Sequence, residues 1–249
     1  MKNYCIFDTE TTDLNKCFCY NIGYVIANEL GEILMKRDFV CSEIWNNIPL
    51  FNTAYYADKR PLYEQAIKNK EATKHTFGYI CKIIQSDFQL FEIEYAFAYN
   101  SSFDEKVFNY NCDWFKVANP FDNIKVLDIR GYAHNFIVNN SYKEFCDKYG
   151  YYTDSGNYSS TAETIYRFIK NNTDFVEEHT ALADSEIECE ILFTCVNLGA
   201  TLETNYPCLR SIHKVRKKIL SIRKDKEIIF DTEYSDIRIN KDKTEITLK

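Results

Sequence analysis

Residues 4–14 run Tyr-Cys-Ile-Phe-Asp-Thr-Glu-Thr-Thr-Asp-Leu, so four apolar residues lead directly into acids and threonines. A short apolar run of this kind predicts a buried strand. Successive side chains of a strand alternate between its two faces, which places Asp8 and Glu10 on the same face at the strand's end. The rest of the fold is predicted outward from this strand and its two acids.

Two further β-rich runs follow, and the Glu-Leu-Gly-Glu between them predicts a hairpin turn. They cover residues 22–30 and 32–40, so the first three strands form an antiparallel meander. Later apolar runs predict two more strands, at residues 95–99 and 126–129. Helical spacing and capping residues predict helices at residues 101–111, 141–149, 160–170 and 182–198. This order of elements predicts a mixed α/β sheet with helices on its faces.

The chain is expected to divide into a domain at residues 1–200 and an extension at residues 201–249. Within the domain, residues 41–92 change character and predict a helical insert. The extension begins with a basic run at residues 213–226, and a β-hairpin is predicted after it, from residues 227–239 and 244–248. Two interpretations of the basic run stay open: a guide for single-stranded nucleic acid, or an ordinary solvated helix.

Composition limits the class of protein. The 249 residues carry a net charge of −7, which argues against a protein that coats long nucleic acid but fits an acidic metal site. Ten cysteines without a CxxC pair predict reduced thiols that fill the core. We find no signal peptide and no apolar run near the roughly 20 residues of a membrane span. A soluble cytoplasmic protein of a bacterial or phage-infected cell is therefore expected.

The paired acids Asp8 and Glu10 suggest a metal site. Two carboxylates that are close together in apolar surroundings repel each other and stay ionised only beside a cation. Oxygen ligands of this kind suit Mg²⁺ or Mn²⁺. The alternative is that the acids and threonines of residues 8–13 form a simple polar turn.

Three later residues are further candidates, each with a structural alternative. Asp104 follows the strand at residues 95–99, but its spacing from Ser101 also fits a helix-capping box. Asp184 lies in the first turns of the last core helix. His179 precedes that helix by a few residues, where a loop could bring it over a metal site; a lone His beside acids is otherwise a solvated surface group.

Together these motifs resemble one family. An Asp-x-Glu ends the first strand, an Asn-x-x-Phe-Asp follows the fourth, and a His-x-Ala-x-x-Asp opens the last core helix. This order is similar to that of the DEDDh 3′→5′ exonucleases of the ribonuclease H-like superfamily. Those enzymes include the proofreading exonuclease subunit of bacterial replicative DNA polymerase, ribonuclease T and oligoribonuclease. The resemblance covers residues 1–198 in motif order and is strong at the three motifs.

The resemblance implies a ribonuclease H-like sheet of five strands, an antiparallel three-strand meander plus two parallel strands, flanked by helices. It implies that two divalent ions, Mg²⁺ or Mn²⁺, are held by Asp8, Glu10, Asp104 and Asp184, with His179 as general base. Further residues would contact or support the 3′-terminal nucleotide: Thr11, Thr12, Leu14 and Asn100. The chain departs from the family at Asp13, where Gly is usual, and at Tyr99, where His is frequent.

The expected activity is hydrolysis of single-stranded DNA from its 3′ end to nucleoside 5′-monophosphates. An exoribonuclease or a phosphodiesterase of oligonucleotides or small nucleotides is the alternative, because no contact to a 2′-hydroxyl can be identified. A remote alternative is an inactive nucleic-acid-binding or polymerase-associated subunit. The expected partner is a single-stranded 3′ end of a few nucleotides and no membrane; a polymerase partner and a homodimer stay open.

Overall fold

A computed structural model of the chain describes residues 2–209, 237–239 and 246–248. These residues belong to two compact units. The larger comprises Met1–Tyr151 with Ser160–Arg210, and the smaller comprises Tyr152–Ser159 with Ser211–Lys249. All candidate site residues lie in the larger unit, so its architecture decides the site.

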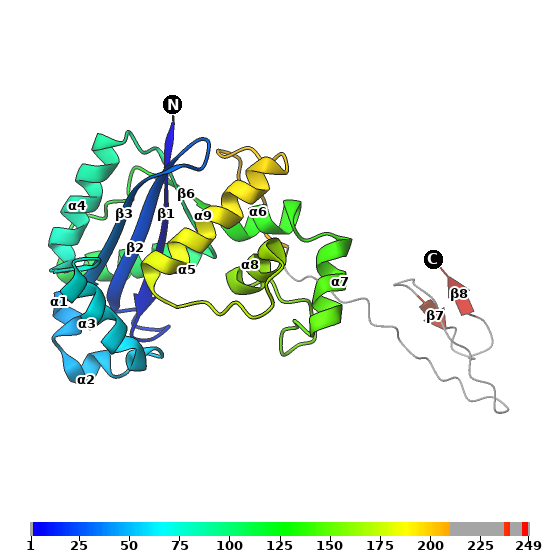
Figure 1. Cartoon of the computed structure of the whole chain (residues 1–249), viewed down its shortest axis with the longest axis horizontal. Helices are drawn as coiled ribbons and strands as arrows, with labels where there is room; N and C mark the ends of the chain where they lie inside the picture. The colour runs from blue at the N-terminus through cyan, green and yellow to red at the C-terminus, as the bar shows by residue number, and fades with distance from the viewer. Residues whose placement is uncertain (1, 210–236, 240–245, 249) are drawn as a thin grey trace. The chain divides into compact units, whose positions relative to one another are not determined.

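Among the described residues, six strands form one sheet in the order β4-β3-β2-β1-β5-β6 (Figure 1). They are β1 (Asn3–Thr11), β2 (Cys19–Asn28), β3 (Ile33–Cys41), β4 (Thr73–His75), β5 (Tyr95–Ala98) and β6 (Lys125–Asp128). The strands β1, β2 and β3 form the predicted antiparallel meander, and β5 and β6 continue the sheet in parallel. The predicted mixed α/β sheet is confirmed.

The sheet has one strand more than the expected five. The additional strand β4 pairs in parallel with β3, with Phe39 opposite Thr73. Its Thr-Lys-His sequence has no apolar run, and it forms because the edge of β3 offers unpaired backbone groups. A helix was also missed: the strand expected at residues 126–129 ends at Asp128, whose carboxylate accepts the Arg130 N–H and begins α6.

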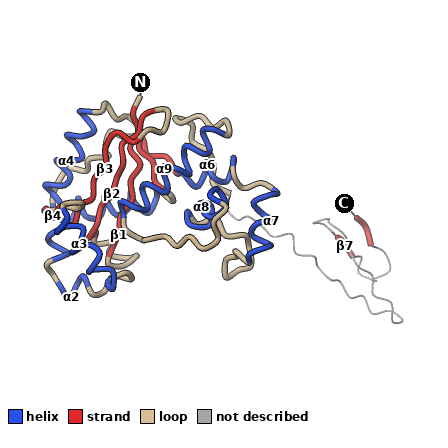
Figure 2. The backbone as a smooth tube through the Cα atoms, in the orientation of Figure 1, coloured by secondary structure: helices blue, strands red, loops and turns tan. Residues whose placement is uncertain are grey.

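Helices lie on both sides of the sheet (Figure 2). Their bounds are α1 (Ser42–Trp45), α2 (Ile48–Phe51), α3 (Arg60–Asn69), α4 (Phe77–Leu90), α5 (Ser101–Phe115), α6 (Ile129–Phe136), α7 (Asn140–Tyr149), α8 (Ala162–Lys170) and α9 (Ala181–Asn197), with a short 3₁₀ helix η1 (Ala57–Lys59). In Figure 1, α9 crosses in front of β1 and β2, against which it packs. On the opposite face, α4 packs against β3, and α5 packs against β1, β5 and β6.

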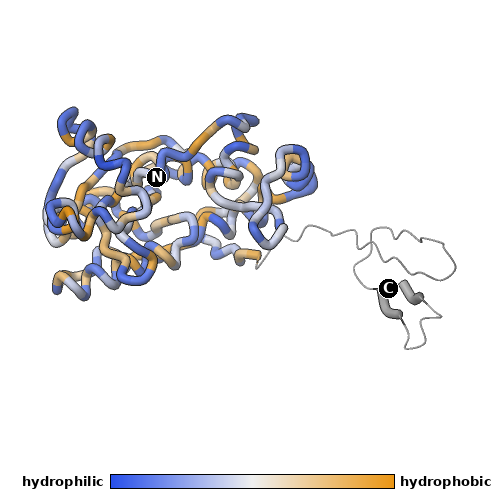
Figure 3. Tube along the Cα trace, turned by 90° about the horizontal axis from the view of Figure 1, so that it is seen from below, coloured by the Kyte–Doolittle hydropathy of each residue, from blue (hydrophilic) through white to orange (hydrophobic). Residues whose placement is uncertain are grey.

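Hydrophobic residues are interspersed with hydrophilic ones along most of the chain (Figure 3), whereas β2, inside the sheet, is buried along its whole length. One apolar cluster joins the sheet to α4 and α5 and includes Phe7, Phe77 and Phe108. A second cluster includes Tyr20 of β2 and Tyr63 of α3. It gives the segment after β3, residues 42–72, a small core of its own. That segment is thereby fixed beside the carboxyl end of β1.

The capping box expected at residues 160–163 is wrong in detail. Thr161 is the N-cap of α8, and its hydroxyl accepts the Thr164 N–H. Glu163 instead pairs with Arg167 at 3.0 Å and accepts the Glu177 N–H. An acid in the first turn of α8 therefore holds the loop that leads to α9.

The ten cysteines all lie among the described residues and are free; nine are buried, which confirms them as core-filling thiols. No helix in the described part of the chain is long and apolar enough to cross a membrane. In the smaller unit, β7 (Ile237–Ile239) pairs antiparallel with β8 (Ile246–Leu248); most of the segment for which a hairpin was predicted lies outside the described residues. The basic run at residues 213–226 lies outside the described residues.

Candidate active site

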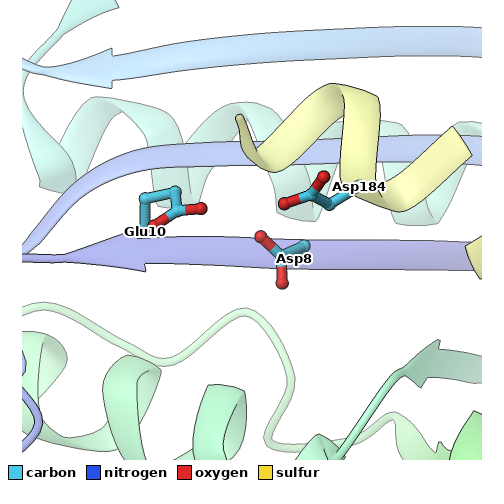
Figure 4. A group of neighbouring side chains, drawn as sticks. All are labelled: Asp8, Glu10 and Asp184. Atoms are coloured by element: carbon cyan, nitrogen blue, oxygen red, sulfur yellow. The ribbon is translucent and has the colours of Figure 1, made fainter. Parts of the chain in front are cut away.

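The structure brings three of the four predicted acids together. Asp8 and Glu10 project from β1 toward Asp184 on α9 (Figure 4), and ligand oxygens of the three carboxylates lie within 4.8 Å of one another. Asp184 is only 6% exposed, and its Oδ1 has no hydrogen-bond partner within the protein. A buried carboxylate oxygen without a donor, beside two further carboxylates, is what a cation site requires.

A close approach of backbones places Asp184 over β1. A Cβ added to Gly23 of β2 would lie 2.1 Å from the backbone nitrogen of Leu182, so only glycine lets the first turn of α9 rest on the sheet. The Ser185 hydroxyl donates to the Gly23 carbonyl at 3.0 Å. The Ala181 N–H donates to Asn21 Oδ1 at 2.8 Å, so β2 supplies the cap that Thr180 does not provide.

Burial and mutual repulsion make this cluster costly without a cation. Burial raises the pKa of Asp8 to about 7, and burial followed by the charge of Asp8 raises the pKa of Asp184 to about 10. The pKa of Glu10 is raised well above its usual value by the same two causes. A divalent cation among the three would favour their ionised forms, so the residues present fit the predicted metal.

Asp104 is buried beside the cluster rather than within it. Its Oδ1 accepts the Thr9 hydroxyl at 2.7 Å, and burial followed by the charge of Asp8 raises its pKa. The capping box with Ser101 is wrong, because Asn100 is the N-cap of α5 and the Ser101 hydroxyl donates to Glu105, although Asp104 does lie in the first turn of that helix. The side chain of Asp104 therefore lies against β1, next to the two acids of that strand.

His179 lies in the loop before α9, where its side chain is 30% exposed. Its Nδ1 is 3.7 Å from Glu177 Oε2, and its ring stacks on Tyr56. Partial burial, followed by the charge of Lys59, lowers the pKa of His179, which keeps the imidazole neutral near pH 7. A neutral imidazole can accept a proton, as the predicted base must.

The predicted nucleotide-contacting residues differ in setting. Leu14 is 73% exposed, whereas Thr12 is buried and its hydroxyl lacks a partner within the protein. The Thr11 hydroxyl donates to the Asp13 carbonyl at 3.3 Å. Asn100 has φ of 66°, a left-handed conformation that Asn tolerates, and its N–H donates to Asp128, so it forms the turn into α5.

Sequence reasoning missed several residues around the acids. Glu188 is buried one turn beyond Asp184, and its Oε2 accepts the Tyr99 N–H at 3.0 Å. The four-residue spacing from Asp184 on a helix was the signal that could have found it. Tyr56 and Lys59, by contrast, come from the segment after β3, and no spacing connects them with the loop at His179.

No protein-family model matches the chain, and no curated protein matches it. Among solved structures it is similar to exonuclease I. Product-bound exonuclease I aligns with TM-score 0.52 at 15% identity, over 80% of this chain and 45% of that one. E. coli exonuclease I with a 5cy-dT13 oligonucleotide gives 0.52 at 13%, over 79% and 41%. An SSB/exonuclease I structure with the inhibitor CFAM gives 0.53 at 14%, over 80% and 43%.

The chain thus spans less than half the length of these neighbours. At such identities the likeness concerns the fold alone, a mixed sheet flanked by helices.

Proposed function

We propose that this chain is a divalent-metal-dependent 3′→5′ exonuclease that hydrolyses single-stranded DNA to nucleoside 5′-monophosphates. The observation that carries the proposal is the convergence of Asp8, Glu10 and Asp184 within 4.8 Å, with a buried Asp184 oxygen that no donor satisfies. The fold likeness to exonuclease I, solved with an oligonucleotide, supports this reaction class.

In this proposal, Asp8, Glu10 and Asp184 would hold one divalent ion, and Asp104 with Asp8 would hold a second. Bound Mg²⁺ or Mn²⁺ would lower the pKa of the attacking water and stabilise the departing 3′ oxygen. The four carboxylates would balance the four positive charges of two such ions.

His179 accepts the proton of the attacking water in this scheme. Its lowered pKa leaves the ring unprotonated at neutral pH, and its partial exposure leaves room for a substrate. Thr11 is the last residue of β1, and Thr12 and Leu14 follow the strand; all three are proposed to line the terminal nucleotide. Asn100 is proposed to support them by fixing the turn that delivers Asp104.

A binding module without activity is disfavoured by the acids themselves. Burying several carboxylates that raise one another's pKa lowers stability, and a protein that needed only a nucleic-acid-binding surface would gain nothing from them. Basic side chains would serve such a surface better, because they neutralise phosphate.

The decisive experiment compares 5′-labelled single-stranded DNA, duplex DNA and RNA with Mg²⁺, Mn²⁺ or EDTA. Laddering from an unblocked 3′ end, absent from a 3′-phosphorylated control and from EDTA reactions, is expected for single-stranded DNA. A stronger ladder on RNA would reassign the substrate to RNA.

The matched variants are Asp184→Asn and Glu186→Gln. Both remove one charge from α9, but Glu186 pairs with Lys36 away from the cluster. We expect loss of at least about a thousand-fold for Asp184→Asn, in line with removal of a transition-state interaction, and near-normal rates for Glu186→Gln. Equal activity of the two variants would refute the metal site.

A further inference from the structure

The loop that carries His179 has little structure of its own. Residues 175–180 form no helix or strand, and His179 itself has φ of 53°, a left-handed conformation that few non-glycine residues adopt, although His does so more often than most. On the C-terminal side the chain is held where Asn21 accepts the Ala181 N–H. On the N-terminal side Glu163 accepts the Glu177 N–H, so residues 178–180 lie between two anchored points, and the imidazole needs a restraint of its own to keep one orientation.

Lys59 of η1 supplies that restraint to the backbone. Its ammonium group donates a hydrogen bond to the Glu178 carbonyl, the peptide directly before His179. The same ammonium lies 4.8 Å from the centroid of the Tyr56 ring. Lys59 thus joins the segment after β3 to the loop before α9, two parts of the chain that are far apart in sequence.

Tyr56 restrains the imidazole directly. Its ring and that of His179 are nearly parallel, with an interplanar angle of 13° and centroids 4.4 Å apart. The Tyr55 ring stands edge-on to the Tyr56 ring at 4.8 Å, while Tyr55 itself is 88% exposed. Tyr56 belongs to neither apolar cluster described above. Its ring contacts the His179 loop through this stack.

We infer that Tyr56 and Lys59 form a clamp that positions the imidazole of His179 for proton transfer: the aromatic face fixes the ring plane, and the ammonium group fixes the preceding peptide. The inference rests on the proposed role of His179 as general base. Both clamp residues are positioning residues, because they act through His179. The segment after β3 thereby contributes to catalysis without supplying a metal ligand.

The clamp is tested first without any reaction. In metal-free protein, ring stacking shifts the His179 Cε1 proton resonance upfield in NMR spectra. Tyr56→Phe keeps the ring and should keep the shift, whereas Tyr56→Leu should abolish it; Tyr55→Leu is the neighbouring control and should leave it unchanged. Lys59→Met should speed amide hydrogen exchange at Ala181, the first hydrogen-bonded N–H after the peptide that Lys59 holds, and Lys59→Arg should restore protection. An unchanged His179 resonance in Tyr56→Leu would overturn the clamp.

Kinetics then test its consequence. Since a misplacement of about 1 Å can cost roughly a hundred-fold, we expect Tyr56→Leu to lower kcat about ten- to a hundred-fold with KM changed less than threefold, and Tyr56→Phe to restore kcat. Melting curves identify any variant that fails to fold. If His179→Ala keeps full activity, the proposed base is wrong; if His179→Ala is inactive while Tyr56→Leu keeps full kcat, only the clamp is refuted.

Discussion

Gly23→Ala tests how strictly the sheet positions α9. The added Cβ would lie 2.1 Å from Leu182 N and 2.2 Å from the carbonyl carbon of Ala181, whereas ordinary contact begins at 3.4 Å. The first turn of α9 would have to retreat by about 1.3 Å, the difference between 2.1 Å and 3.4 Å. Both contacts are with backbone, which cannot rotate away as a side chain can. The retreat would separate Asp184 from Asp8.

The magnitude follows from these contacts. Overpacking against a rigid neighbour destabilises a fold by about 1–3 kcal/mol. We expect the upper end, because the retreat also stretches two hydrogen bonds between α9 and β2, from the Ser185 hydroxyl to the Gly23 carbonyl and from the Ala181 N–H to Asn21. A shift of this size between catalytic groups should lower kcat/KM by roughly a hundred-fold or more on single-stranded DNA. Urea unfolding measures the first quantity, and steady-state kinetics under conditions where the variant is folded measure the second.

Two glycines provide controls for Gly23. A Cβ on Gly131 would lie 2.1 Å from the Tyr206 carbonyl oxygen, so Gly131→Ala should also destabilise the fold, but it leaves α9 and the acids in place and should preserve kcat/KM. Gly78→Ala meets only the Val117 side chain at 3.0 Å and should be tolerated. If Gly131→Ala and Gly23→Ala lose activity equally, the loss reflects stability alone and the positional argument is refuted.

Three further predictions concern the same site. Folding raises the pKa of Asp8 from 3.8 to about 7 and that of Asp184 from 3.8 to about 10. Between these values the native state keeps protons that the unfolded state has lost. The free energy of unfolding of the metal-free protein should therefore be greatest in acid and fall as the pH rises from 3.8 toward about 10. Mg²⁺ should then raise Tm more at pH 8 than at pH 5, and an equal increase at both would contradict the linkage. Burial raises the pKa of Glu188 well above its usual value, so folding at neutral pH must offset the loss of an ionised carboxylate. Glu188→Gln removes this cost and keeps an acceptor for the Tyr99 N–H, so it should raise the Tm of EDTA-treated protein, whereas Glu188→Ala should lower it; a lower Tm for both would show that the carboxyl group itself is needed. Asn21→Ala leaves the Ala181 N–H without its acceptor and should cost about 1–3 kcal/mol in urea unfolding, while an unchanged midpoint would show that another group caps α9.

Much of the fold was predictable because its signals are local. The apolar run before Asp8 and the alternation after it gave β1 and the shared face of two acids, and the hairpin turn at Gly31 gave the meander. β4 was not predictable, since its three residues owe their conformation to pairing with β3 rather than to their own composition.

The site was predictable only in part for a similar reason. The spacing of Ser101 and Asp104 predicted a capping box within one helix, but the Asp104 carboxylate instead accepts a hydrogen bond from Thr9 on β1. The stack between Tyr56 and His179 depends on how the segment after β3 folds onto its own small core, which no periodicity in the sequence reports. Tertiary contacts decided both cases.

The contact between Gly23 and α9 also decides when the acid cluster can form during translation. Asp8 belongs to the first strand, and Asp184 to the last helix of the larger unit. The meander that carries Asp8 pairs residues close in sequence, but α9 can settle on Gly23 only after everything between them has been synthesised. A nascent or prematurely terminated chain without α9 therefore carries Asp8 and Glu10 but lacks Asp184, so it cannot form the cluster of three acids. Under the proposed function, the chain cannot hydrolyse nucleic acid until α9 has been synthesised.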